Sequence, residues 1–529
     1  MLFGRKCMFD NIFVMFILAL LPIIWLVIAL CGFKMQAHVA SVGAFIVALI
    51  EAIFIWKMPA LLAGSAALEG FAMAIWPIVI VIIAAVFTYN LTVYTGAMDI
   101  IKRMITSVSF DKRILIILIG WCFGGFLEGM AGFGVAIAIP ASMLYAMGFN
   151  PVYAILACLI ANGCPTMFGS IGIPTTTLAA VTGLDATHLA FTQTLQVAPL
   201  LFISPFLMIM LVSGGFKGLK GMIPFTLVAS LSFVIPEIIA ARFIGADLPV
   251  IIASVCSLAC TFAYASRYGK THVVPEEYKM EIPKQENEQP ITVKSALIAW
   301  CPFILIFVLL LLTSKLVPFI NEPLSAIKSS VFIYQGEGAS PYTFTWVNTP
   351  GVLILVSGII GGIIQKCHFK DLVKVMKETI IQMSKTICTM LGVLACAKIM
   401  GYSGMISSIS TFFVTVLGTF FPFASPLIGA LGTFVTGSGT SSEVLFGNVQ
   451  LEAARAIGTN EYWLVAANSL GVSAGKMLAP QSIAIGCAAC ALTGKDGEIL
   501  AKIAKYAFGY IIIMALIVFF GVNIYEAFI

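Results

Sequence analysis

Two long apolar regions of this chain repeatedly interrupt their own helices. The first, at 114–182, contains FLEGMAGFG (126–134) and IANGCPTMFGSIGIPTTT (160–177), and the second, at 420–492, carries breaks of the same kind. Inside a bilayer, backbone N–H and C=O groups find no water, so broken backbone survives only where it is buried in protein or lines a cavity. Two such regions, one in each half of a chain, are typical of a transporter's binding site.

The composition indicates that lipid rather than water surrounds most of the chain. Of its 529 residues, 60% are hydrophobic and only 10% are charged, whereas a soluble domain carries about 25% charged residues. The net charge of +5 is small for this length, and the basic residues mostly flank apolar stretches, as loop charges do in membrane proteins. We therefore expect a multi-pass protein in a lipid bilayer, with no nucleic-acid partner.

The uninterrupted apolar stretches predict an all-α integral membrane fold. A transmembrane helix needs about 20 apolar residues, and such stretches lie near 12–32, 37–56, 70–94, 192–213, 221–245, 247–268, 296–320, 349–367, 381–400 and 505–525. Together with full or half helices from the two broken regions, the expected total is about 12 to 14. The polar stretch 269–294 predicts a flexible linker between an N-terminal half (1–268) and a C-terminal half (295–529).

The two halves resemble each other at their unusual residues. Gly129 matches Gly437 at an offset of 308 residues, and after a slip of two residues Asn162 matches Asn468. The matches keep the same order along both halves and fall on Gly, Asn and Pro rather than on Leu or Ile. They predict an internal repeat, and an inverted repeat would place two broken elements face to face at the centre of the bilayer.

Polar residues beside the breaks are the candidates for substrate binding. A helix that begins inside the membrane has unpaired N–H groups at its start, and that end attracts anions. Asn162 and Asn468 each stand before a predicted break, where an Asn can either cap broken backbone or bind a ligand. The remaining candidates are hydroxyl and amide side chains near the breaks: Thr175, Thr176, Ser438, Gln481 and Ser482. The glycines expected to form the broken backbone are Gly129, Gly132, Gly134, Gly169, Gly437 and Gly475.

Two charged residues are expected at membrane depth in these regions. Glu128 interrupts an apolar run, and an ionisable group there is by default a functional candidate. Because burial favours the neutral form of a carboxyl group, Glu128 is our candidate for proton coupling; the alternative is a structural Glu at the end of a span. Lys476 is a candidate to neutralise a substrate carboxylate, and the alternative is a lysine that reaches to the surface. Glu443 fits a binding site and a loop equally well.

Several other classes of function lack their signatures in this sequence. There is no P-loop GxxxxGK[ST] and no HExxH motif, and the four His residues form no cluster. Cys487 and Cys490 form a CxxC with apolar neighbours, so we expect them to act as small hydrophobic residues. We therefore expect no catalytic residues, no metal, no cofactor and no enzymatic activity. A channel is less favoured than a carrier, and nothing in the sequence indicates a particular oligomeric state.

Five motifs in the two broken regions together resemble those of the L-lactate permease family. They are FLEGMAGFG (126–134), IANGCPTMFGSIGIPT (160–175), TGSGTSSEVLFGNVQ (436–450), AANSLG (466–471) and GKMLAPQSIAIG (475–486). The resemblance implies a symporter of the bacterial inner membrane that imports L-lactate, glycolate and similar 2-hydroxy monocarboxylates together with protons.

This chain departs from the pattern of that family at three places. Val135-Ala136 stands where members commonly have Thr-Pro, Gly439 stands where they often have a polar residue, and Glu443 stands where they often have Asn. A lost Thr near the site can change which carboxylate fits, and an added Glu can alter coupling. The alternative function is therefore a sodium-coupled transporter of another small organic anion.

Proton symport also agrees with the candidate residues. Bringing an anion such as lactate into a negative interior costs about 2.3 kcal/mol per charge per 100 mV, and one accompanying proton cancels that cost. Asn162, Asn468, Lys476 and the restarted helices would bind the anion, and Glu128 would carry the proton. Sodium held by carbonyl groups of the breaks would serve the same purpose without Glu128. Either way, we expect alternating access in which one set of broken elements moves against a fixed scaffold.

Overall fold

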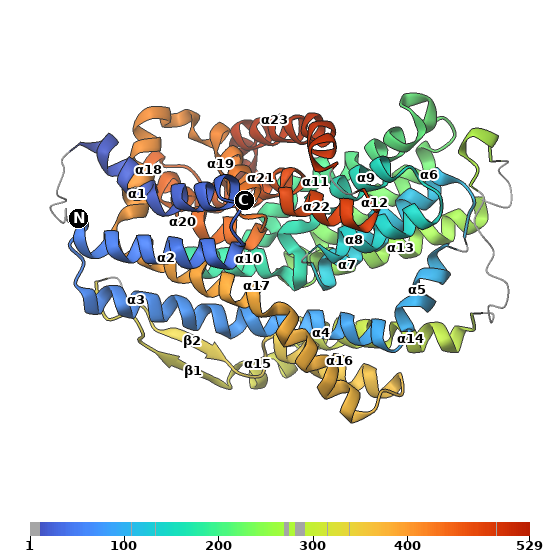
Figure 1. Ribbon diagram of the computed structural model, residues 1–529, viewed down its shortest axis with the longest axis horizontal. Helices are drawn as coiled ribbons and strands as arrows, with labels where there is room; N and C mark the ends of the chain where they lie inside the picture. The colour runs from blue at the N-terminus through green and yellow to red at the C-terminus, as the bar shows by residue number, and fades with distance from the viewer. Residues whose placement is uncertain are drawn as a thin grey trace.

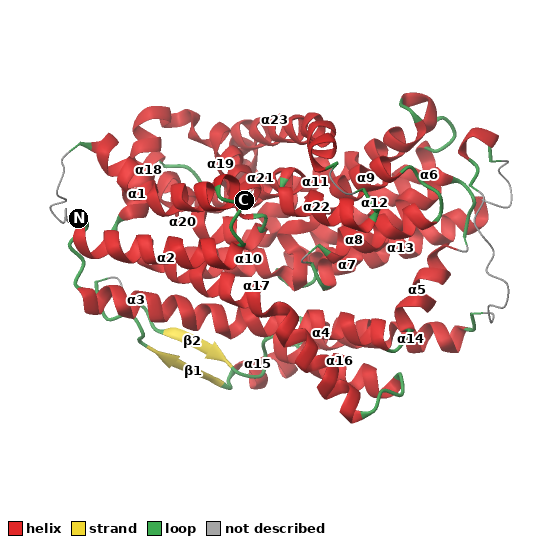
Figure 2. Cartoon of the chain, viewed as in Figure 1, coloured by secondary structure: helices red, strands yellow, loops and turns green. Residues whose placement is uncertain are grey.

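The computed structural model describes residues 11–106, 108–132, 134–268, 274–280, 291–314, 316–337, 339–492 and 495–528. These residues are almost entirely helical, with one two-stranded hairpin (Figure 2). Within them, 12 helical segments are long and apolar enough to cross a membrane. The predicted all-α integral membrane fold is thereby confirmed.

The helices on either side of the breaks gather into one region with the helices packed against them, and we call this region the broken-helix core. From the N-terminal half it takes α7 (Gly124–Met130), α8 (Val135–Ala146), α9 (Pro151–Gly163), α10 (Gly169–Thr182) and α11 (Ala186–Ser213). From the C-terminal half it takes α19 (Phe421–Thr436), α20 (Gly439–Ile457), α21 (Glu461–Leu478), α22 (Pro480–Ala489) and α23 (Asp496–Phe528). The two halves are interleaved, since α21 packs against α9 and α11 as well as against α19 and α20 (Figure 1).

The other helices flank this core. Along the lower and left part of Figure 1 lie α1 (Ile12–Val27), α2 (Ala37–Phe54), α3 (Ala60–Met73), α4 (Ile80–Tyr94), α14 (Val293–Leu312), α16 (Pro350–Ile364), α17 (Phe369–Ser403) and α18 (Met405–Leu417). At the right-hand end lie α5 (Ala97–Thr106), α6 (Lys112–Leu115), α12 (Ile223–Phe243) and α13 (Pro249–Tyr268). Two of the predicted spans are shorter or longer than expected: α16 has only 15 residues, whereas α17 has 35.

Small residues bring the flanking helices close together. A Cβ atom added to Gly70 on α3 would lie 2.5 Å from the Cα atom of Ala395 on α17. A Cβ atom added to Gly361 on α16 would lie 2.6 Å from Pro302 on α14. In a bilayer, such close backbone approach supplies the van der Waals contact that holds helices together. The long helix α17 therefore joins the N-terminal helices α2 and α3 tightly to the C-terminal half.

The polar connections contain short segments that pack against the helices. Of the expected linker, residues 269–273 and 281–290 lie outside the described part of the chain. Between them, Tyr278 is buried beneath the Arg113 guanidinium, whose carbon lies 4.1 Å from the centre of the Tyr278 ring. This contact ties Tyr278 of the predicted linker to α6, and the division of the chain into two halves stays a prediction. Later, α15 (Pro318–Ser325) precedes a hairpin of β1 (Lys328–Val331) and β2 (Tyr342–Thr345).

Candidate functional site

Two breaks, one in each half, interrupt the chain in the broken-helix core. In the first, α7 gives way to α8 through Gly132 and Gly134, with φ of +57° and +86°. In the second, α19 gives way to α20 through Gly437, with φ of +69°. The left-handed region costs little only for Gly, which explains the residue type at all three positions. Ser438 then caps α20, because its hydroxyl oxygen accepts a hydrogen bond from the Ser441 N–H at 3.3 Å.

A further break in the N-terminal half lies between α9 and the regular part of α10. A 3-10 turn, Cys164–Phe168, follows α9, and Gly169 is extended. Ser170, Ile171 and Gly172 then adopt φ of +48°, +59° and +69°. The helix restarts directly after this left-handed turn, so that Pro174 falls in its first turn, where a missing N–H does no harm.

The second half departs from the predicted breaks. The sequence Ser469-Leu-Gly471 was expected to interrupt a helix, yet α21 is continuous from Glu461 to Leu478, and the break comes at Ala479 before α22. An added Cβ at Gly471 would collide with the Pro426 carbonyl oxygen, and one at Gly475 with the Ala430 carbonyl oxygen. These glycines therefore let α19 pack closely against α21, and the assignment of Gly475 to broken backbone was wrong.

Gly129 is likewise not at a break. It lies inside α7, where an added Cβ would approach a side-chain atom of Ile251 on α13 to 3.0 Å. By contrast, Gly169 lies at a break and against the Glu128 carboxylate, where a larger residue would collide with Oε1. Gly169 thus lacks a side chain for a steric reason, since its extended backbone is open to any residue.

The first break region brings Glu128 and Asn162 together. The Asn162 side-chain N–H donates a hydrogen bond to Glu128 Oε2 at 2.6 Å, and the two residues are only 2–3% exposed. Asn162 Oδ1 has no hydrogen-bond partner among the described residues. The Thr166 hydroxyl donates to the Asn162 backbone carbonyl at 2.6 Å and ties the following turn to α9. A buried carboxyl group and a free amide oxygen therefore share one small region.

The second half contains a corresponding pair. The Asn468 side-chain N–H donates to Glu443 Oε2 at 2.7 Å, and both residues are fully buried. Glu443 lies in the second turn of α20, so the loop alternative was wrong, and a role in a binding site stays a prediction. Its other oxygen, Oε1, has no hydrogen-bond partner among the described residues.

A chain of polar side chains joins the second pair to the N-terminal half. The Ser469 hydroxyl interacts with the Glu443 carboxyl group and accepts a hydrogen bond from the Gln193 amide on α11. Gln193 Oε1 accepts in turn from the Thr175 hydroxyl on α10, at 2.8 Å. Sequence reasoning missed Gln193 and Ser469. The signal that could have found the first is the occurrence of two glutamines, at 193 and 196, near the start of the predicted apolar stretch 192–213.

Lys476 and Gln481 meet at the break between α19 and α20. The Lys476 ammonium group donates to the Gly437 carbonyl at 3.1 Å, where the C-terminal end of α19 favours a cation. Its positive charge also interacts with the negative charge of Glu128. Gln481, although exposed, touches the Gly437 position, and Ser482 is buried beside it in α22. Lys476 thus links the second break to the first.

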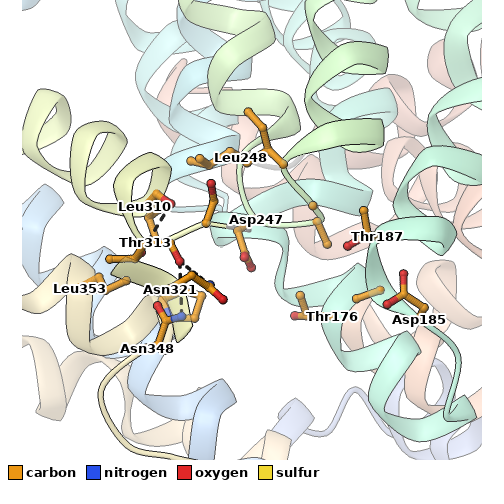
Figure 3. Close-up of a pocket in the computed structure, with 16 residues that line it drawn as sticks. Thr176, Asp185, Thr187, Asp247, Leu248, Leu310, Thr313, Asn321, Asn348 and Leu353 are labelled. Carbon is orange, nitrogen blue, oxygen red and sulfur yellow. Dashed lines mark hydrogen bonds between the residues drawn. The ribbon is translucent and has the colours of Figure 1, made fainter. Parts of the chain in front are cut away.

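Thr176 faces a different space from its neighbour Thr175. It lines a cavity of about 230 Å³ between the ends of α10, α12 and α14, together with Asp247, Thr313, Asn321 and Asn348 (Figure 3). In Figure 3, the Asp247 carboxylate lies between the two asparagines on one side and Thr176 on the other. Asp247 belongs to the loop between α12 and α13, outside the spans, and burial raises its pKa from the ordinary 3.8 to about 6.

This cavity ends against the left-handed turn of α10. A Cβ atom added to Gly172 would collide with the Ala246 carbonyl oxygen and lie 3.0 Å from the Asp247 Cα atom. Three residues earlier, Gly169 touches Glu128. The same short segment of α10 therefore separates the cavity from the buried Glu128–Asn162 pair. No group of three or more His, Cys, Asp or Glu residues in the described part of the chain is arranged to hold a metal ion.

One family model and several curated relatives match the sequence of this chain. The family model described as L-lactate permease matches residues 15–525. An L-lactate permease of Streptococcus iniae is 42% identical over 450 residues, covering 85% of this chain and 93% of that protein. The glycolate permease GlcA of Escherichia coli K12 is 35% identical over 521 residues, covering 93% of this chain and 92% of that protein.

Among solved structures, MtrF of Neisseria gonorrhoeae, described with a class of antimetabolite efflux pumps, aligns with a TM-score of 0.46 and 14% identity over 86% of this chain and 83% of that chain. The family match spans residues 15–525, which include the broken-helix core except for the last three residues of α23. This protein is therefore a multi-pass permease of the plasma membrane, and it belongs to the L-lactate permease family.

Proposed function

We propose that this protein imports L-lactate and similar 2-hydroxy monocarboxylates, such as glycolate, by proton symport. The relatives' names supply the substrate class. The single observation that carries the mechanism is the Glu128–Asn162 pair, which places a buried carboxyl group and a free amide oxygen at a helix break. Lys476, from the opposite half, brings a positive charge to the same pair.

A 2-hydroxy monocarboxylate has two features for a binding site to recognise, and the site offers a group for each. Its carboxylate would bind the Lys476 ammonium group and the donors of the restarted helices, among them the Ser438 and Ser482 hydroxyls and the Gln481 amide. Thr175, whose hydroxyl already donates to Gln193, would support this region without touching the substrate. Its hydroxyl group would donate a hydrogen bond to Asn162 Oδ1, which has no partner among the described residues. Asn468 would position the equivalent region of the second half.

Substrate and proton would depend on each other through Lys476. While the site is empty, the Lys476 charge stabilises the ionised form of Glu128. When a substrate carboxylate neutralises Lys476, that stabilisation falls, and burial then favours the protonated form of Glu128. The substrate thus promotes uptake of the proton, and by linkage the proton promotes binding of the substrate. Together they cross the membrane without the cost of moving a single negative charge.

The cavity at Asp247 would be the aqueous approach to this site from one side of the membrane. Movement of the short α10 segment between Gly169 and Gly172 would open or close the route to Glu128. The flanking helices, held by the close contacts of α17 with α2 and α3, would form the scaffold. This arrangement supports alternating access by motion of the broken elements.

The second candidate is sodium coupling, which carbonyl groups of the interrupted backbone would support. Uptake of radiolabelled L-lactate into proteoliposomes, in sodium-free buffer with an inward proton gradient, distinguishes the two. We expect uptake that is accelerated by the gradient, abolished by a protonophore, and reduced by competing glycolate. Uptake that needs sodium and ignores the proton gradient would contradict proton symport. No lactate uptake under either condition would contradict the substrate, with Val135, Ala136 and Glu443 as the first positions to examine.

A further inference from the structure

We propose that Glu443 carries a second proton in each transport cycle, so that two protons accompany each monocarboxylate. This inference rests on the proton symport proposed above. Its basis is the repetition of one geometry in the two halves. Asn162 near the end of α9 holds Glu128 at 2.6 Å, and the matching Asn468 on α21 holds Glu443 at 2.7 Å. Both carboxyl groups are almost completely buried.

Glu128 and Glu443 occupy different positions relative to the glycine break of their own half. At the repeat offset of 308 residues, Glu128 corresponds to Thr436, and Glu443 corresponds to Val135. Glu128 therefore precedes its break, whereas Glu443 follows its break. Since each half supplies one acid to its own asparagine, the second acid is not a copied feature of the repeat. Glu443 reaches Asn468 from a different position in the repeat than the position from which Glu128 reaches Asn162.

Among the described residues of the helices packed against α20, no positive charge accompanies Glu443. The helices α10, α18 and α19, which pack against α20, carry no charged residue. On α21, Glu461 pairs with Arg455 at 2.9 Å, and Lys476 lies at the break and interacts with Glu128. On α17, the lysine nearest to the C-terminal end, Lys398, pairs with Glu69 at 2.8 Å. A buried carboxylate without a counter-ion is costly, so Glu443 is neutral and holds a proton in this state.

Glu443 is also placed to lose that proton when the halves move. Ser469 connects it to Gln193 and Thr175, which belong to the N-terminal helices α11 and α10. The helix α10 also contains the left-handed turn that contacts Glu128 through Gly169. A movement of α10 that opens the site would therefore break hydrogen bonds next to Glu443 and admit water. This gives the second acid a step at which its proton can exchange.

Another buried acid provides a matched control. Glu237 on α12 is fully buried, and neither of its carboxyl oxygens has a partner among the described residues. Unlike Glu443, it has no asparagine from the repeat and lies outside the broken-helix core. If burial alone made an acid a proton carrier, Glu237 and Glu443 would behave alike.

The experiment measures the membrane potential at which net L-lactate flux stops in proteoliposomes, with a fixed lactate gradient and no pH gradient. With two protons per lactate, one net positive charge moves inward, so a tenfold higher internal lactate concentration is balanced by an inside-negative potential of about 59 mV. With one proton, transport is electroneutral, and no potential stops the flux. We expect the 59 mV balance for the wild type and for Glu237→Gln, and its loss for Glu443→Gln.

The wild-type measurement alone can overturn this inference. An electroneutral wild type that still responds to a pH gradient would contradict the second proton and leave the proposed symport intact. A wild type without any response to a pH gradient in sodium-free buffer would contradict the symport itself. Glu443→Gln protein that exchanges internal for external lactate, and is therefore folded, but keeps the 59 mV balance would assign the second proton to another residue and overturn the role of Glu443.

Discussion

The two asparagine–carboxyl pairs of the broken-helix core are alike in geometry and different in surroundings. Asn162 and Asn468 hold Glu128 and Glu443 at nearly the same distance. Glu128, however, interacts with the charge of Lys476, whereas Glu443 contacts only uncharged partners. The repeated asparagine determines where each half can hold an acid, while the neighbouring charges determine what changes the protonation of that acid. In our proposal, substrate binding changes the protonation of Glu128, and movement between the halves changes that of Glu443.

The largest expected effect comes from removing the charge that distinguishes the two pairs. Lys476→Met should weaken the apparent affinity for L-lactate about 10- to 100-fold, because a charge-assisted hydrogen bond contributes about 1.5–3 kcal/mol. The measurement is initial uptake as a function of lactate concentration. Lys502→Met is the control, since Lys502 is 46% exposed and forms a surface pair with Glu498 of little energetic weight. Wild-type affinity in Lys476→Met would contradict the anion-binding role.

The next effect separates the two asparagines. Asn162→Ala should reduce the preference for lactate over propionate, which lacks the 2-hydroxyl group, by about tenfold, because one hydrogen bond to a substrate hydroxyl is lost. Asn468→Ala should leave this preference unchanged, since the Asn468 side-chain N–H already donates to Glu443 and its Oδ1 accepts from Gln450. Competition of each acid against labelled lactate measures the preference. Equal losses in both variants would show that the asparagines do not differ in their relation to the substrate.

The smallest effect concerns the acid outside both pairs. Burial raises the pKa of Asp247 to about 6, above its ordinary value of 3.8, so the folded protein binds this proton more tightly than the unfolded chain. The cost of ionising Asp247 is therefore absent below pH 3.8 and complete above pH 6. Asp247→Asn should raise the melting temperature in detergent by a few degrees at pH 7.5 and leave it unchanged near pH 4. A difference that is the same at both values would contradict the assignment.

Much of the fold could be predicted from the sequence, because lipid imposes strong rules on helices. The apolar stretches of about 20 residues became helices, and the glycines at 132, 134 and 437 adopt the left-handed conformations that interrupt them. Breaks at 164–172 were visible as Gly and Pro in an apolar run. At the glycines the local residue type was enough, since the left-handed backbone costs little only for Gly. Ser170 and Ile171 share that backbone, and their residue types did not predict it.

Positions that depend on a neighbour could not be predicted in this way. Gly471 and Gly475 looked like breaks, yet they allow α19 to approach α21, and a small residue serves both purposes equally well. The Glu443–Asn468 pair was hidden because the repeat offset places Val135, not an acid, opposite Glu443. Gln193 links the two halves because it hydrogen-bonds to Thr175 and to Ser469, and its position in the sequence does not reveal these two partners. These contacts are properties of packing rather than of sequence spacing.

The most direct test of the account compares two assays on Glu128→Gln, a change that keeps the side chain's size and an acceptor for Asn162. One assay measures lactate uptake driven by a proton gradient, and the other measures exchange of labelled for unlabelled lactate across the membrane at equal pH. We predict that exchange continues at the wild-type rate while uptake driven by the proton gradient falls well below it, because the substrate site remains and the proton linked to substrate binding through Lys476 is missing. Gradient-driven uptake at the wild-type rate would contradict the assignment of Glu128 as the acid that couples lactate to protons.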